Sequence, residues 1–490
     1  MNAHAYSPVT GQTVQDLRKL IGASNVSADL EKRIAYSYDE VPRFYWDKEY
    51  VAEVVVFPES TEDVSEVMRY ANDHRIPVTP RGAGTGLSGG AVPFSGGIVL
   101  SFEKMHRILE LDKQNLTITV EPGVVTAEIT KAAEREGLLY AGDPCSGDAS
   151  FIGGNVAENA GGNKVVKYGT TGNSVLALEA VLPDGTVTWF GGKRRKDATG
   201  YDFAHLIVGS EGTLAVVTKI ILKLLPLPGK VVDLLVPFPD VAAAIDFAPR
   251  VMSEGKVIPS SMEFMDRRSI KLAERFLNTR LPFDDAGAHL IIQLEGNDPE
   301  VLADDMERIG DLCFERGALE VFVADNRTTR DKLWKARKCM AEAIMAFYPK
   351  YSLEDLVVPT SEIPKLMAET TRLCTKYGLE EANFGHVGDG NMHVNILFPE
   401  ERPDWHDIID SLLDELYDFT ASIGGTLSGE HGIGLKRQKY MCRVMDEAQM
   451  ELIHRVKLAF DPNNILNPGK MISCPERPGQ PPESPPAGHA

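Results

Sequence analysis

The 490-residue chain lacks any apolar stretch of the roughly 20 residues that a membrane-spanning helix needs. Its first residues also lack a basic segment followed by an apolar run, the mark of a signal peptide. We therefore expect no transmembrane segment and a cytoplasmic protein, which a partner could bring to a membrane surface. Positive charge is scarce as well, with 51 Lys and Arg against 71 Asp and Glu and a formal net charge of −20. This excess of negative charge argues against nucleic acid as a partner.

Cysteine is sparse, and no Cys-x-x-Cys pair occurs. The chain therefore carries no obvious iron–sulfur or structural zinc site of its own. Scattered cysteines suit reduced thiols in a reducing compartment. The six cysteines are Cys145, Cys313, Cys339, Cys374, Cys442 and Cys474.

Glycine, by contrast, is concentrated in the segment Pro80–Gly90, which we call the glycine loop. Five of its eleven residues are glycine, and this excludes the interior of a helix or strand. Bare backbone can approach a ligand closely, and successive N–H groups form a concavity for an anion such as a pyrophosphate. The loop contains no Gly-Lys-Ser/Thr, so it is not a Walker loop, and the glycines that follow prevent a helix from opening on it. The flanks predict a capped helix and a strand before the loop and another strand, Gly97–Leu100, after it.

A second run of small residues lies at 153–162, after the segment Gly142–Ser146. Such residues permit the backbone to pack closely on a flat ring, although a plain loop is the simpler interpretation. Two glycine-rich runs with strands between them favour a site for an extended ligand. Further along the chain, Leu178–Phe190 is predicted to form a hairpin that turns at Pro183–Gly185. The segment Gly209–Leu214 then precedes another β-rich run.

A further pattern is the turn Gly388–Asn391 between two apolar runs. A four-residue hairpin loop here places His386 directly opposite His393 on one face, with Cβ atoms roughly 5 Å apart. That spacing would let both imidazoles reach one divalent ion, and Asn395 shares the face. A carboxylate could come from Gly429-Glu430-His431-Gly432, although a solvated loop glutamate is the simpler interpretation.

These motifs together resemble the FAD-binding fold of the vanillyl-alcohol oxidase and p-cresol methylhydroxylase superfamily. Within it, the chain from about Val51 to Lys470 is similar to the FAD-linked D-lactate dehydrogenase and glycolate oxidase large-subunit group. The resemblance implies FAD, held without a covalent bond because 82–86 contains no histidine. It also implies that the following residues bind the cofactor: Pro80, Arg81, Gly82, Ala83, Gly84, Thr85, Gly86, Leu87, Ser88, Gly89, Gly90, Pro122, Gly123, Asp143, Pro144, Ser150, Gly153, Gly154, Asn155, Ala157, Asn159, Gly161, Gly162, Glu211, Gly212 and Asn467.

The same resemblance implies a divalent metal held by His386, His393 and Glu430. Ligands of this kind suit zinc, manganese or iron, and the sequence does not choose among them. Arg337 would clamp a substrate carboxylate through its planar fork, against the simpler interpretation of a surface salt bridge. His431 would act as general base, and Asn395 is the third residue that we assign to catalysis.

The predicted fold is α+β, with a two-lobed FAD-binding fold, a ferredoxin-like cap and a helical C-terminal segment. The cap prediction rests on a strand–helix–strand pattern that occurs twice between 231 and 324. We expect an FAD-binding domain at 1–227, with a lead-in at 1–48 and FAD lobes at 49–227. A cap follows at 228–415, then a segment at 416–474 that returns to the flavin and a disordered tail at 475–490. In the lead-in, Leu17, Leu20, Ile21 and Leu30 are the expected core.

The function that follows is oxidation of a D-2-hydroxy acid, D-lactate first and glycolate next, by hydride transfer to the flavin. Electrons would pass to an electron-transfer flavoprotein, an iron–sulfur subunit or a quinone, and a homodimer stays open. Alternatives are a D-2-hydroxyglutarate-type dehydrogenase, a glycolate oxidase subunit of a larger complex, and a catalytically silent flavoprotein subunit. Aldolase-like or hydrolytic metal chemistry would leave both glycine-rich runs without a purpose.

Overall fold

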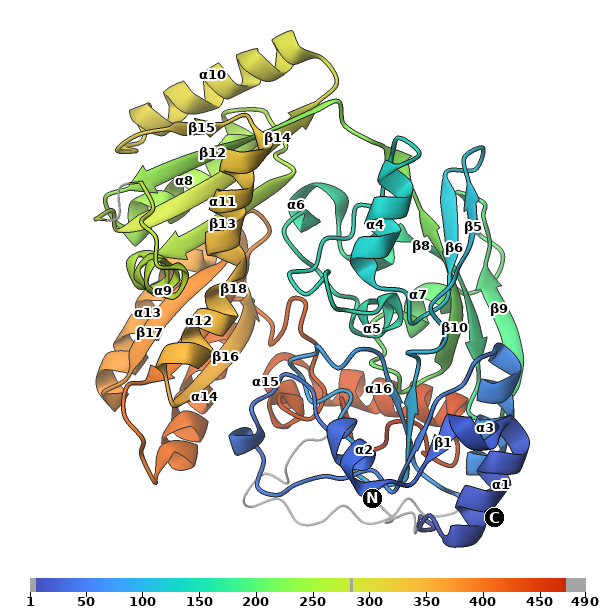
Figure 1. Ribbon diagram of the computed structural model, residues 1–490. Helices are drawn as coiled ribbons and strands as arrows, with labels where there is room; N and C mark the ends of the chain where they lie inside the picture. Colours follow the sequence, from blue (N-terminus) through green and yellow to red (C-terminus); the bar gives the residue numbers. More distant parts are fainter. Residues whose placement is uncertain (1–5, 283–284, 473–490) are drawn as a thin grey trace.

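The computed structural model describes residues 6–282 and 285–472 (Figure 1). Two sheets, of four and five strands, form one half of the molecule, and a seven-stranded sheet forms the other. The predicted tail at 475–490 lies outside the described residues. Among the described residues, no helix combines the length and the apolar character needed to cross a membrane.

The four-stranded sheet has the order β1-β2-β4-β3, with β2, β4 and β3 parallel. Helix α3 joins β2 to β3 and begins where the Ser60 side chain accepts the N–H of Asp63. In the lead-in, Leu17 and Ile21 are buried as predicted, whereas Leu20 and Leu30 are 40% and 57% exposed, so their assignment to the core was wrong. The elements are α1 (Gly11–Ile21), β1 (Val26–Ser27), α2 (Leu30–Ala35), β2 (Val54–Val56), α3 (Thr61–His74), β3 (Val78–Arg81) and β4 (Ile98–Ser101).

The five-stranded sheet is antiparallel, in the order β5-β6-β10-β8-β9. The predicted hairpin is confirmed as β8 and β9. The small-residue run at 153–162 is not a plain loop, because its residues up to Glu158 belong to helix α5. Asn159 follows the helix with a left-handed backbone conformation. The elements are β5 (Ile108–Asp112), β6 (Thr117–Val120), α4 (Thr126–Glu134), β7 (Leu138–Leu139), α5 (Ile152–Glu158), α6 (Val165–Tyr168), β8 (Val175–Val181), β9 (Val187–Gly191), α7 (Phe203–Ile207), β10 (Val216–Lys223) and β11 (Leu225–Pro226).

The seven-stranded sheet has the order β15-β12-β14-β13-β17-β18-β16 and is antiparallel throughout. Its first four strands show the ferredoxin-like order expected from the repeated pattern. Side chains alternate along β12 and β14 between two buried clusters, so helices cover both faces. The elements are β12 (Lys230–Phe238), α8 (Val241–Ser253), β13 (Ser261–Asp266), α9 (Arg267–Leu277), β14 (Ala288–Gly296), α10 (Pro299–Glu315), β15 (Phe322–Ala324), α11 (Arg327–Lys338), α12 (Met340–Phe347), β16 (Lys350–Val357), α13 (Ile363–Tyr377), β17 (Glu380–His386) and β18 (Asn391–Phe398).

The last part of the chain crosses back from the cap to the first half. Helix α14 (Trp405–Ser422) packs on α13, and α15 (Met441–Val444) and α16 (Glu447–Phe460) follow. In Figure 1, α16 lies with the first half, and Lys457 Nζ donates to the carbonyl of Thr213 there at 2.8 Å. Leu466 then forms a parallel bridge with Val78, which brings the end of the described chain beside the glycine loop. Short 3-10 turns complete the fold: Ala23–Asn25, Arg43–Tyr45, Thr171–Ser174, Thr360–Glu362 and Gln438–Tyr440.

Candidate active site

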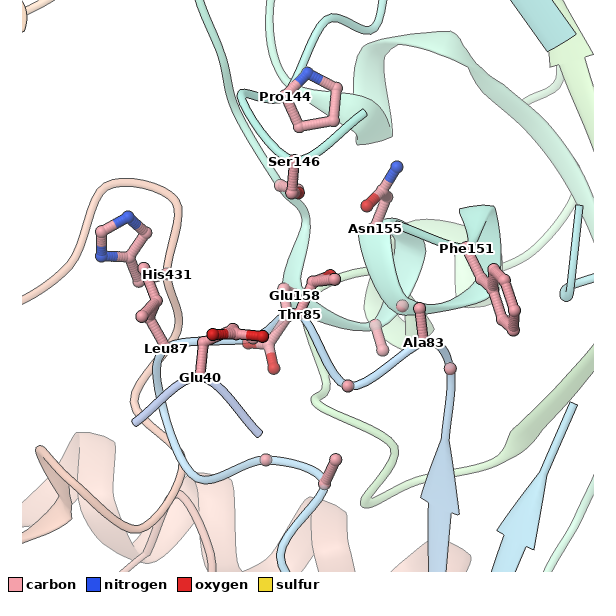
Figure 2. A pocket seen from close by; sticks show the side chains of 18 of the residues that line it. Glu40, Ala83, Thr85, Leu87, Pro144, Ser146, Phe151, Asn155, Glu158 and His431 are labelled. Atoms are coloured by element: carbon pink, nitrogen blue, oxygen red, sulfur yellow. The ribbon is translucent and has the colours of Figure 1, made fainter. Parts of the chain in front are cut away.

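A cavity of about 480 Å³ lies where the two halves meet (Figure 2). The first half contributes the glycine loop, α5 and the turn before β10, and the cap contributes α11, α12 and β16. At one end the cavity reaches Glu430 and His431. The predicted cofactor residues that line it are Pro80, Arg81, Gly82, Ala83, Gly84, Thr85, Gly86, Leu87, Gly90, Pro122, Pro144, Gly153, Gly154, Asn155, Ala157, Glu211 and Gly212.

The other predicted cofactor residues hold this lining from behind. The carbonyl of Ser88 accepts from the N–H groups of Leu435 and Lys436, and Ser150 bonds Thr126. The Asn159 side chain accepts from Gly172 N–H at 2.8 Å. Whether any of these residues contacts the cofactor stays a prediction. The full set is Ser88, Gly89, Gly123, Asp143, Ser150, Asn159, Gly161, Gly162 and Asn467.

Backbone rather than side chains shapes the centre of the cavity. Gly84 has φ +81°, and a Cβ there would lie 2.1 Å from Arg81 Nη2. A Cβ on Gly82 would come within 3.5 Å of the Gly154 nitrogen, so the glycine loop and α5 approach each other closely. A Cβ on Gly154 would meet no atom within 4 Å, which leaves room beside α5 for a ligand. The glycines thus serve the close approach that a flat, extended cofactor requires.

The end of the chain closes the glycine loop. Asn467 Nδ2 donates to the carbonyls of Gly90 at 3.1 Å and Glu211 at 2.8 Å. Lys470 Nζ donates to the same Gly90 carbonyl at 2.7 Å. Asn467 thus lies beside the glycine loop, and its contact with the cofactor stays a prediction.

The histidine hairpin forms with a register that differs from the predicted one. His386 lies opposite Asn391, and His393 lies opposite Phe384, so the direct pairing of the two histidines was wrong. The loop is 387–390 because Gly390 takes φ +92° and Asp389 Oδ1 accepts the N–H of Asn391. The difference amounts to two positions, which keeps both histidines on one face as diagonal neighbours.

Three ligand-type atoms nevertheless converge. His386 Nε2 and His393 Nε2 are 3.3 Å apart, and Glu430 Oε1 lies 3.2 Å from the first and 3.3 Å from the second. Metal–ligand bonds of roughly 2.0–2.2 Å place neighbouring ligands about 3.0–3.5 Å apart. The triangle therefore fits one metal ion bound on its open side. Glu430 packs on the first half, since a Cβ on Gly161 would lie 2.7 Å from Glu430 Oε2.

Two buried carboxylates that the sequence analysis did not single out support this cluster. Glu263, on β13, accepts from His386 Nδ1 at 2.7 Å and from Arg337 Nε at 2.9 Å. Asp355 Oδ2, on β16, accepts the N–H groups of Gly429, Glu430 and His431 at 2.9, 2.9 and 2.8 Å. Both acids lie on strands that carry other polar residues as well, Ser261 and Asp266 on β13 and Ser352 and Glu354 on β16, so no signal in the sequence marked them.

The charges of the cluster also suit a cation. Burial opposes a charge on His386 and His393, but neighbouring carboxylates, Glu430 among them, raise the pKa of both. Burial likewise opposes the charge of Glu430, and the two histidines lower the pKa of its carboxyl far below its usual value. A divalent ion would balance these carboxylates in place of protons on the histidines.

A second grouping of ligand-type atoms is Asp355, His393, Glu430 and His431, which lie within 4.8 Å of one another. Asp355 is already saturated, because it accepts three backbone N–H groups, the Ser428 hydroxyl and the Asn391 amide. It therefore fits the role of an anchor for the turn 428–431 better than that of a ligand. His393 and Glu430 belong to both groupings.

The remaining predicted catalytic residues surround the cluster. Burial lowers the pKa of His431 to about 4, so its imidazole is neutral at pH 7 and can accept a proton. Its ring stacks on His393, with centroids 5.1 Å apart. Asn395 donates to the carbonyls of Ala382 and His393 at 2.6 and 2.9 Å, and within the described chain its buried Oδ1 has no hydrogen-bond partner.

Arg337 is 2% exposed, so the simpler interpretation of a surface salt bridge was wrong. Its Nε and Nη2 lie 2.9 and 2.8 Å from Glu263 Oε2, and its guanidinium carbon lies 4.7 Å from the centre of the Phe384 ring. Because two of its nitrogens face Glu263, the contact with a substrate carboxylate stays a prediction.

Comparisons with known proteins agree with the cavity and the fold. Residues 52–191 match the family described as FAD binding domain, and residues 227–471 match FAD linked oxidases, C-terminal domain. The glycolate oxidase subunit GlcD of Bacillus subtilis (strain 168) is 36% identical over 466 residues, which cover 95% of this chain and 97% of the relative. A D-lactate dehydrogenase of Archaeoglobus fulgidus is 38% identical over 440 residues, covering 89% and 95%.

Among solved structures, p-cresol methylhydroxylase with bound substrate superimposes with a TM-score of 0.77 at 19% identity, over 96% of this chain and 99% of that one. This likeness confirms the predicted fold. The two matched domains and the long, close relatives go further. The chain belongs to the family of FAD-linked oxidoreductases that contains the glycolate oxidase subunits GlcD and the D-lactate dehydrogenases.

Proposed function

We propose that this protein is an FAD- and metal-dependent dehydrogenase of a D-2-hydroxy acid, with D-lactate as the first candidate and glycolate as the second. The observation that carries the proposal is the triangle of His386 Nε2, His393 Nε2 and Glu430 Oε1, of which Glu430 lines the cavity proposed to bind FAD. The names of the relatives, D-lactate dehydrogenase and glycolate oxidase subunit, support this substrate class.

When bound, FAD supplies a two-electron acceptor, and the metal supplies a Lewis acid for the substrate hydroxyl. His386, His393 and Glu430 would hold the metal, and three protein ligands would leave further coordination positions for the substrate. The guanidinium of Arg337 would bind the substrate carboxylate, and Glu263 holds that guanidinium in place. The hydrogen on the hydroxyl-bearing carbon would leave as hydride to that two-electron acceptor and the hydroxyl hydrogen as a proton to His431, so the substrate would become the 2-oxo acid.

His431 would take the proton of the substrate hydroxyl at Nε2. Its Nδ1 lies 3.8 Å from Asp355 Oδ2, beyond hydrogen-bonding distance, and within the described residues this nitrogen has no hydrogen-bond partner. Asp355 accepts the backbone N–H of His431, so this carboxylate sets the position of the turn that carries the ring. The neutral imidazole is then ready to accept a proton.

A direct test is to remove the metal ligands one at a time. His386→Ala, His393→Ala and Glu430→Gln should each lose bound metal and D-lactate turnover while FAD absorbance stays at the wild-type level, because Glu430 is the only one of the three that lines the cavity and Glu430→Gln keeps its size. His454→Ala is a matched control, since His454 lies on α16, outside the site. Full activity in a metal-free preparation would contradict the metal assignment.

The bond to FAD is proposed to be noncovalent, since 82–86 contains no histidine. Acid precipitation should release the flavin into the supernatant. Yellow colour that stays with the denatured pellet would show a covalent link.

The electron acceptor is proposed to be a separate protein or a quinone. Relatives named as subunits of glycolate oxidase support a partner protein. Artificial dyes should then reoxidise the flavin faster than oxygen does, and rapid stoichiometric hydrogen peroxide would instead indicate an oxidase. Substrate assays should include D-2-hydroxyglutarate, and an inactive isolated chain that binds FAD would favour a silent subunit.

A further inference from the structure

Two glutamates, the buried Glu211 and the partly buried Glu158, lie side by side in the wall of the cavity, and their surroundings differ. Glu211 is 5% exposed and accepts the N–H groups of Ile433 and Gly434 at 2.7 and 2.6 Å. Its own backbone takes φ +52°, an unusual conformation for a glutamate, and this turn directs the side chain toward 432–434. Two backbone donors stabilise a carboxylate, so Glu211 is the ionised member of the pair.

Glu158, the last residue of α5, has fewer hydrogen-bond donors around its carboxyl group than Glu211 has. Its Oε1 accepts only from the Ser88 hydroxyl, at 3.2 Å, and within the described residues its buried Oε2 has no hydrogen-bond partner. The ion pairs of the described chain do not include Glu158. The two carboxylates are close together, because a Cβ on Gly432 would lie 1.9 Å from Glu158 Oε2 and 3.1 Å from Glu211 Oε1.

Two neighbouring carboxylates that share a buried site do not both ionise, because repulsion and the loss of water penalise the second charge. The hydrogen-bond donors decide which one keeps its proton. Glu211 holds two N–H donors, whereas an ionised Glu158 would be an almost unpaired buried charge. Burial and the charge of Glu211 accordingly raise the pKa of Glu158 well above its ordinary value.

A neutral carboxylic acid has an O–H that needs an acceptor. Glu158 is among the residues that line the cavity (Figure 2), and its contact with Ser88 places it beside the glycine loop. Within the described residues, Oε2 of Glu158 has no hydrogen-bond partner, whereas FAD offers acceptors in its ring carbonyls, ring nitrogens and phosphate oxygens. We propose that Glu158 is a cofactor-positioning residue, a neutral carboxylic acid whose Oε2–H donates a hydrogen bond to an acceptor atom of bound FAD.

The inference requires only FAD binding and is independent of the proposed metal and substrate. Its consequence is a cofactor affinity that depends on the proton of Glu158. From neighbouring elements Glu158 faces Glu211, Asp39, Ser88 and Lys470, and Asp39 and Lys470 can themselves titrate. The diagnostic quantity is therefore the difference between wild type and a Glu158 variant, not the wild-type curve alone.

The experiment measures the Kd of FAD for the apoprotein by quenching of FAD fluorescence between pH 6 and 10. Glu158→Gln keeps a hydrogen-bond donor without an ionisable group, so its Kd should stay within about threefold of wild type at pH 6. Above the pH at which Glu158 ionises, wild type should weaken more than the variant. Glu158→Ala should weaken FAD binding about five- to 150-fold, the worth of one buried hydrogen bond to a cofactor.

Glu211→Gln is the matched contrast, because its amide would direct N–H groups at backbone donors. It should lower the unfolding temperature of the apoprotein, which Glu158→Gln should leave unchanged. The absorption spectrum of bound FAD locates the acceptor: a shifted flavin band in Glu158→Ala places it on the ring, and an unchanged band with weaker binding places it on the ribityl or phosphate part.

Two results would overturn the proposal. One is Glu158→Ala binding FAD as tightly as wild type. The other is Glu158→Gln binding as weakly as Glu158→Ala at pH 6, since the charged form would then be required. If Glu158→Ala does not fold, the comparison of wild type with Glu158→Gln across pH decides the question alone.

Discussion

The two sides of the candidate active site differ in the groups that shape them. On the FAD side, the cavity is shaped by glycines whose backbones approach one another, as at Gly82 and Gly154. On the cap side, buried charged side chains hold one another, as Glu263 holds both Arg337 and His386. Where backbone shapes the site, an added side chain should disturb ligand binding. Where charged side chains shape it, removal of one charge should do so. Variants of each kind therefore test this difference.

The largest expected effect is on the cap side, at the proposed base. His431→Asn should reduce the rate of flavin reduction by D-lactate about 10²–10⁴-fold, the usual worth of a positioned acid–base group. FAD and metal contents should stay at wild-type levels. Anaerobic single-turnover absorbance at the flavin band measures the step directly, and reduction at the wild-type rate would leave His431 as a structural neighbour only.

The next effect concerns a residue that touches neither cofactor nor substrate. Glu263→Gln removes the negative charge shared by Arg337 and His386, so we expect a 10- to 100-fold loss of metal affinity, as for other residues that orient metal-bound histidines. Metal titration of the apoprotein measures this loss. Asp233→Asn is a suitable control, because Asp233 is also a buried acid of the same sheet but bonds Gln293 and Trp334 instead. Equal losses in both variants would point to a general effect on the cap.

On the FAD side, we expect one added methyl group to weaken FAD binding. Gly154→Ala introduces a Cβ into open space beside α5, so the apoprotein should keep its stability, while FAD affinity falls about tenfold through crowding of the ligand. Gly123→Ala is the opposite case, since its Cβ would lie 2.1 Å from the Phe102 carbonyl and should destabilise the fold itself. Unchanged FAD binding in Gly154→Ala would place the cofactor elsewhere in the cavity.

The smallest effect is expected where the two sides meet. The Cys145 thiol is exposed at the cavity wall, and its contact with Asn163 Oδ1 is long, at 3.9 Å. Cys145→Ser should therefore change turnover by no more than about twofold, as steady-state assays can show. A larger loss would reveal a contact of the thiol with substrate or flavin.

The same contrast explains what the sequence could predict. The glycine loop was recognisable because glycine spacing alone excludes other structures, and the ferredoxin-like strand order followed from a repeated pattern. The histidine hairpin was predicted with the correct face but the wrong register, because register depends on which glycine takes the positive φ. Glu263 and Asp355 were not predicted, since their roles arise only when distant strands bring them to His386 and to the turn 428–431.

The contacts of Asn467 and Lys470 with the Gly90 carbonyl bear on the order of events during synthesis. Gly90 and Asn467 are 377 residues apart in the chain, and ribosomes add about 5–20 residues per second, so roughly 20–75 s separate the appearance of the two contact partners. The glycine loop therefore lacks these contacts until residues 467–470 have been synthesised. The glycine loop consequently reaches its final set of contacts only after Lys470 has been synthesised.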